Sequence, residues 1–115
     1  MVIFESEAHM VESFNHHDEL IRQCALGHLS FAEFCTEYRD FYAFYALDGH
    51  ESDEEERTLL ERYKERVEVH RVVFEDILGG VCSDADAQLE SYQRAGRFGS
   101  AEAVRRLRDL AAVHL

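Results

Sequence analysis

The sequence predicts an all-α protein, an antiparallel bundle of four main helices plus one short helix. The chain of 115 residues contains no proline, whereas β-rich and loop-rich proteins normally place prolines in their turns. Apolar residues recur at helical spacing in several segments, and serine-led capping boxes precede two of them. Short connections favour antiparallel neighbours. We expect one domain, residues 1–115, because a second core would be too small to fold.

The first helix is expected over residues 6–26. Ser6 can cap its start, and Gly27 suits its end. The expected inward stripe consists of Ala8, Val11, Phe14, Ile21 and Ala25, with Met10, Leu20 and Cys24 alongside. The stripe weakens over residues 15–18, Asn-His-His-Asp, where a break in the helix is an alternative.

The second helix begins at a capping box, in which Ser30 accepts from a free backbone N–H and Glu33 reaches back. Leu29 and Phe34 have the spacing of a hydrophobic staple around this cap. The helix is expected to end at residues 48–50, Asp-Gly-His. An aromatic run within it, residues 41–45, is expected to pack in the core. Base stacking, the alternative, needs a basic groove, and this segment is flanked by acids.

The third helix is expected to start at a second capping box, Ser-Asp-Glu-Glu at residues 52–55, and to run unbroken to about residue 78. Its length would be roughly 39 Å at the rise of an α-helix. Its apolar stripe is Leu60, Tyr63, Val67, His70, Phe74 and Ile77. On such a stripe His70 is expected to be a hydrogen-bonded core histidine rather than a metal ligand.

Two helices complete the bundle. Ser83 can cap a short one over residues 84–93, and residues 94–99 are expected to form a loop. Ser100 can cap the last one, which should run through about residue 113. Its inward positions are Val104, Leu107, Leu110 and Ala111.

The formal net charge is -12, from 24 acids and 12 bases. Residues 1–93 contain 22 of the acids and 7 of the bases, whereas residues 94–115 contain 2 acids and 5 bases. Such a field repels nucleic acid and anionic membranes and attracts basic proteins. We therefore expect a basic protein partner, and neither nucleic acid nor a membrane.

The cysteines and the N-terminus indicate a cytoplasmic protein. Cys24, Cys35 and Cys82 form no C-x-x-C pair and lie beside apolar residues, as structural thiols do. No signal peptide and no apolar stretch of membrane-spanning length is present.

The residue patterns give little support for metal binding or catalysis. His9, Glu12 and His16 could share one helix face, but the Glu-x-x-His and H-E-x-x-H motifs are absent. No spacing links a cysteine, a histidine and an acid into a catalytic group. We expect no metal, no cofactor and no enzymatic activity.

The most distinctive chemical feature is an acidic cluster of six carboxylates within nine residues: Asp48, Glu51, Asp53, Glu54, Glu55 and Glu56. One or two acids would suffice to complement a helix dipole, which is the alternative explanation. The excess predicts a docking patch for a basic surface. Phe44 falls off the inward stripe of its helix and is a candidate for the same partner surface.

Residues 26–34, Leu-Gly-His-Leu-Ser-Phe-Ala-Glu-Phe, followed by Tyr38, resemble the opening hairpin of colicin D-type immunity proteins. Residues 99–115 are similar to the closing helix of that family. The resemblance implies a small helical bundle that binds a transfer-RNA-cleaving toxin and covers its active site, with acidic side chains meeting the cationic cleft. It implies structural roles for Ser30, Glu33 and Phe34.

The predicted function is therefore an immunity protein that binds and blocks a cationic nuclease toxin. A dense negative face suits such a partner, since a nuclease needs a positive cleft to hold phosphates. The alternative is a helical adaptor or regulatory subunit that docks a basic or helical partner protein.

Overall fold

The computed structural model of the chain describes residues 6–38, 41–44, 47 and 53–115. The elements are α1 (Glu7–Ala25), α2 (Phe31–Tyr38), α3 (Phe41–Phe44), α4 (Glu54–Arg62), α5 (Lys64–Arg71), the π-helical η1 (Val72–Leu78), the 3-10 helix η2 (Asp86–Gln88), α6 (Glu90–Arg94) and α7 (Ser100–His114). The described residues contain no strand, only one isolated bridge between Val81 and Phe98. The all-α prediction is confirmed.

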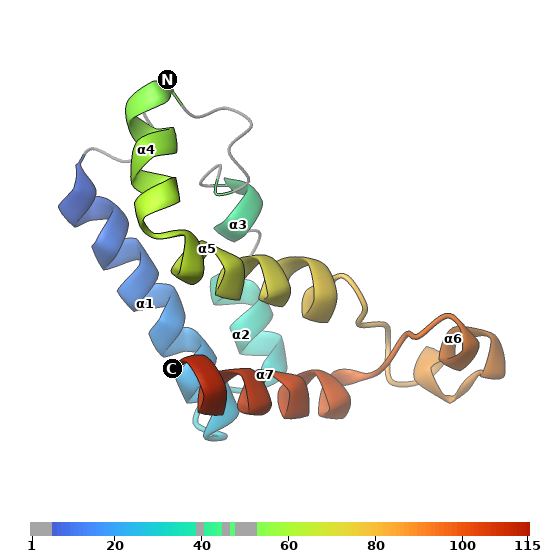
Figure 1. Ribbon diagram of the computed structural model, residues 1–115. Helices are drawn as coiled ribbons and strands as arrows, with labels where there is room; N and C mark the ends of the chain where they lie inside the picture. Colours follow the sequence, from blue (N-terminus) through green and yellow to red (C-terminus); the bar gives the residue numbers. More distant parts are fainter. Residues whose placement is uncertain (1–5, 39–40, 45–46, 48–52) are drawn as a thin grey trace.

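Helix α1 lies against α7 and α2 (Figure 1). η1 follows directly on α5. η1 contacts α7, and α5 contacts α3. α4 runs in a different direction from α5, so the two do not form one straight rod (Figure 1). The antiparallel bundle as a whole stays a prediction.

Helix α1 has the predicted ends. Ser6 is its N-cap, with its hydroxyl accepting from the backbone N–H of His9 at 3.1 Å. Gly27 follows the helix with a φ of +82°, a conformation that suits glycine. The helix does not break over residues 15–18. Its buried residues differ from the expected stripe, since Ala8 is exposed and the inward face consists of Met10, Phe14, His17, Asp18, Ile21 and Cys24.

The capping box of α2 is confirmed. The backbone N–H of Glu33 donates to the Ser30 hydroxyl at 3.1 Å, and the Ser30 N–H donates to the Glu33 carboxylate at 3.4 Å. Phe34 and Tyr38 are buried, as are Phe41 and Tyr42 of α3. The expected helix end at residues 48–50 lies outside the described residues.

The long third helix predicted by the sequence was wrong in its start and in its continuity. Asp53, rather than Ser52, is the N-cap of α4, because its carboxylate accepts from the N–H of Glu56 at 2.8 Å. Tyr63, with φ -106° and ψ 25°, interrupts the helix between α4 and α5. From Val72 the segment winds as a π-helix up to Gly79.

Residues 79–99 form an arm that projects from the helical body (Figure 1). Ser83 accepts from the N–H of Asp86, and the short helix predicted over residues 84–93 occurs as two pieces, η2 and α6. The carboxylate of Asp84 accepts from the backbone N–H of Ser100 at 2.9 Å and from its hydroxyl at 3.0 Å. Gly99, rather than Ser100, occupies the N-cap of α7.

The core is built mainly from α1, α2, α5, η1 and α7. Its largest fully buried side chains are Tyr38, Phe14, Phe34, Phe41, Met10, Ile21, Leu107, His70, Val73 and Cys24. Within the described ranges, no helix combines the length and apolarity needed to cross a membrane.

Candidate functional site

The acidic cluster falls partly within the described residues. Asp48 and Glu51 lie outside them, and Phe44 belongs to α3, although its side chain is outside the description. The remaining members, Asp53 to Glu56, form the N-cap and first turn of α4. The helix dipole favours carboxylates at this position.

The carboxylates of this turn have different environments. Glu56 is 5% exposed, which corrects the expectation that it belongs to a surface patch. Asp53 is half-buried and its carboxylate caps the helix. Glu54 and Glu55 are exposed, and within the described part of the chain no cation pairs with them. Glu54 also borders a shallow hollow of about 490 Å³ with Arg57, Thr58 and Glu61.

A second group of functional side chains joins α1 to α2 and α5. In this buried polar chain, Nε2 of His70 lies 2.8 Å from Oδ1 of Asp18, and Nδ1 of His70 lies 2.6 Å from the Tyr38 hydroxyl. Arg66 donates to Oδ2 of Asp18 at 2.6 Å and to Asn15 at 2.9 Å. The buried side-chain oxygens and nitrogens of Asp18, His70 and Tyr38 therefore all have partners.

Burial and hydrogen bonds shift the pKa values of Asp18 and Tyr38 in this buried polar chain. Burial alone would raise the pKa of Asp18, but the bonds from His70 and Arg66 outweigh it and hold that pKa below its ordinary value. In the tautomer with its proton on Nε2, His70 donates a hydrogen bond to the ionised Asp18 and accepts one from the Tyr38 hydroxyl at Nδ1. Burial raises the pKa of Tyr38, so its hydroxyl stays protonated as the donor.

An aspartate and a histidine in contact also occur in general-base catalysis, where the second imidazole nitrogen reaches the substrate. Here His70 is 0% exposed, and its second nitrogen is already bonded to Tyr38, which is 1% exposed. No substrate atom can approach that nitrogen in this arrangement. The buried polar chain therefore has a structural role, because its hydrogen bonds join α1, α2 and α5. His70 is the hydrogen-bonded core histidine that the sequence predicted.

The outer end of the buried polar chain opens on a cleft where α1, α5 and the end of α7 meet. The cleft has a volume of about 410 Å³ and is lined by Asn15, Asp18, Arg22, Glu65, Arg66, Val69, His114 and Leu115. Its arginines are paired, Arg66 with Asp18 at 2.6 Å and Arg22 with Glu19 at 3.2 Å. Both guanidiniums therefore already have a carboxylate partner.

His17, next to Asp18 on α1, is a second buried histidine. Its ring stacks on Phe41 with centroids 3.6 Å apart, and Nδ1 donates to the carbonyl of Ser13 at 2.7 Å. Burial lowers the pKa of His17 to about 4, despite the hydrogen bond to Ser13, which raises it. At neutral pH His17 is therefore an uncharged part of the core.

The described part of the chain brings together no candidate metal site. Among the described residues, no group of three or more histidines, cysteines, aspartates or glutamates has the geometry to hold an ion. The thiols of Cys24, Cys35 and Cys82 are free, and burial raises the pKa of Cys24 to about 11. That thiol is protonated and unreactive at neutral pH.

Comparisons of the chain with protein-family models, with curated proteins and with solved structures find no match. The resemblance to colicin D-type immunity proteins is neither supported nor contradicted by them.

Two features of the site were missed in the sequence. His17 and Asp18 interrupt an apolar stripe, and the partners that make their burial favourable lie on α3 and α5. Asp18 is separated from Arg66 by 48 positions and from His70 by 52. One signal in the sequence could have revealed them. His70 lies on the apolar stripe of another helix, and a buried histidine requires a polar partner.

Proposed function

We propose that this protein is an immunity protein that binds a basic nuclease toxin and blocks it, without itself being an enzyme. The observation that carries the proposal is a set of exposed carboxylates with no cationic partner in the described chain. Glu54 and Glu55 stand at the start of α4, and Glu65 stands on α5. They leave a negative surface free for an external basic group.

A nuclease is the partner class that this surface suits best. A nuclease must hold phosphates, so its cleft is lined by lysines and arginines. Opposite fields steer two such proteins together and raise the association rate. The buried polar chain supports a binding role in a second way, because its bonded, enclosed groups keep the helices fixed without offering a reactive site.

The test uses the toxin nuclease encoded by the gene immediately upstream and measures its association rate with the purified protein at low and high salt. The double variant Glu54→Lys/Glu55→Lys should associate about tenfold more slowly, and high salt should slow the wild-type protein. Cells that carry this variant should lose protection from the toxin. The dipole penalty, about 0.3–1 kcal/mol per site, leaves the protein folded.

A matched control keeps the same change of net charge at another place. Glu12 on α1 and Glu37 on α2 are both exposed, and Glu12→Lys/Glu37→Lys should bind nearly as the wild-type protein does. An equal loss in both variants would mean that net charge alone acts. A partner with no nuclease activity would favour the adaptor or regulatory-subunit hypothesis.

A further inference from the structure

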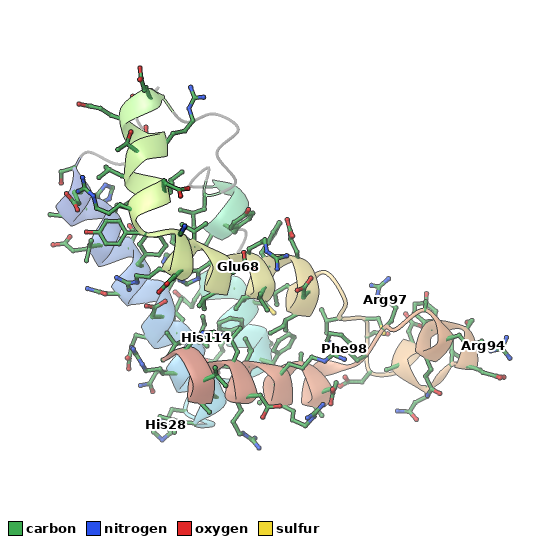
Figure 2. The ribbon with its side chains drawn as sticks, viewed as in Figure 1. His28, Glu68, Arg94, Arg97, Phe98 and His114 are labelled. Atoms are coloured by element: carbon green, nitrogen blue, oxygen red, sulfur yellow. The ribbon has the colours of Figure 1, made fainter. Side chains whose placement is uncertain are left out.

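A groove runs between α5 with the start of η1 and the last turns of α7. It has a volume of about 320 Å³ and is lined by Glu65, Glu68, Val69, Val72, Asp109, Leu110, Val113 and His114. Figure 2 shows Glu68 on α5 and His114 at the end of α7, on the two helices that border it. A second hollow, lined by Lys64, Glu65, Glu68 and His114, continues it along α5.

The centre of the groove is aliphatic. Val69 and Leu110 are 8% and 9% exposed and form part of its lining, next to Val72. Val113 is 77% exposed, so its side chain stands largely in solvent at the edge. Leu26 and Leu89 are the other large apolar residues with high exposure in the described chain, and neither lines the groove. Val113 thus differs from an isolated surface hydrophobe.

The edges of the groove are acidic. Glu65, Glu68 and Asp109 line it, and no lysine or arginine does. Arg71 pairs with Glu68 but also with Glu75, and Arg105 pairs with Asp109 but also with Glu102. Each of these guanidiniums is shared between carboxylates, and Glu65 has no cationic partner in the described chain. The field over the aliphatic centre is therefore negative.

We infer that this groove binds a segment of the protein partner in which an aliphatic side chain is flanked by lysine or arginine. The aliphatic side chain contacts Val69, Leu110 and Val113, and the basic groups meet Glu65 and Asp109. An apolar centre with a charged rim is the usual anatomy of a binding hot spot. The inference rests on the proposed function and adds an apolar anchor, away from the first turn of α4.

Charge disfavours a second copy of this chain that meets the first one groove to groove. Two copies that met through this groove would place Glu65 and Glu68 of one against acidic groups of the other, since α4, α5 and η1 carry many exposed carboxylates. Like charges in an interface disfavour association. A basic segment of a different protein has the opposite sign and is favoured.

The experiment titrates the ¹⁵N-labelled protein, residues 1–115, with a synthetic helical peptide. In this peptide each leucine is followed by an arginine four positions later, so that the two share one helix face. Amide signals of Val69, Leu110 and Val113 should shift. The variant Val113→Asp should weaken binding of the peptide by about tenfold, whereas Leu26→Asp should not. Both positions are exposed, so both variants should fold.

A second peptide of the same length, with glutamate in place of arginine, tests the charge. It should leave the spectrum unchanged. Equal binding of both peptides, shifts confined to the first turn of α4, or unchanged affinity in Val113→Asp would each overturn the inference.

If Val113→Asp fails to bind the peptide yet cells remain protected from the toxin, the groove is not the toxin contact while the immunity function stands. Lost protection in Glu54→Lys/Glu55→Lys, with peptide binding intact, separates the two surfaces.

Discussion

His70 and Asp18 are in hydrogen-bond contact, 2.8 Å from Nε2 to Oδ1, although 52 positions separate them in the chain. The contact joins α5 to α1 inside the core, with Phe14 stacked beside the imidazole at 5.5 Å. Arg66 reaches the same carboxylate from one turn earlier on α5 and lies over the Phe14 ring at 4.9 Å.

Replacing Asp18 by alanine should destabilise the protein strongly. The change leaves the buried His70 and the partly buried Arg66 without their acceptor, and breaking a buried ion pair on one side costs about 3–5 kcal/mol. Urea denaturation followed by circular dichroism measures the difference. The control is Glu19→Ala, which removes an exposed pair with Arg22 and should leave the midpoint nearly unchanged. Similar midpoints for the two variants would contradict the role assigned to Asp18.

The stability should fall in mild acid because of His17. Its pKa is about 4 in the folded protein and 6.5 in the unfolded chain, so between these values the unfolded chain binds more protons. Above about pH 6.5 the protonation of His17 has no effect on stability. From there toward pH 4 the free energy of unfolding falls by about 1.4 kcal/mol per pH unit. Asp18, whose pKa is lowered from 3.8, acts in a more acidic range. Thermal melts across this range, with His17→Phe as the comparison, should show a flatter profile for the variant.

The cap of α2 should be measurable by itself. Ser30→Ala removes the acceptor for the N–H of Glu33 and should cost about 1 kcal/mol. Phe34 is 0% exposed, and Phe34→Ala should cost about 3–5 kcal/mol through the cavity it leaves. Denaturant midpoints in the same buffer compare both. A near-neutral Phe34→Ala would mean that another face of α2 is turned inward.

The arm should loosen when Asp84 is replaced by alanine. The carboxylate of Asp84 accepts both the N–H and the hydroxyl of Ser100 and thereby closes the base of the arm against α7. These hydrogen bonds hold the pKa of Asp84 below its ordinary value. Limited proteolysis should cut residues 82–97 faster in Asp84→Ala than in Asp86→Ala. Equal cutting rates would show that Arg97, which donates to the carbonyls of Gly80 and Val81, holds the base alone.

Local signals in the sequence were enough for the elements that depend on neighbours. Ser6, Ser30 and Gly27 act within a few positions of themselves, and each was predicted correctly. His70 was predicted as a core histidine because the apolar residues around it recur at helical spacing. Such features depend on short-range geometry alone, which the residue order contains.

The remaining features depend on distant partners. The break at Tyr63 lies within a continuous helical pattern, and there the Tyr63 hydroxyl donates to Glu7 on α1 at 2.6 Å. Arg62 donates to the same carboxylate at 3.0 Å. Competition between a straight helix and these tertiary contacts is invisible in a local window. The groove between α5 and α7 has the same origin, since it is formed between elements.

The arm also changes how the protein behaves in solution. The radius of gyration is 15.1 Å, and the extents are 46 × 28 × 23 Å, whereas a compact domain of this length has a radius of gyration of about 13 Å. An elongated particle diffuses more slowly and elutes earlier from a sizing column than a sphere of equal mass. A monomer of 13.4 kDa would therefore be read as a heavier species by elution volume, and its oligomeric state has to be measured by light scattering or sedimentation equilibrium.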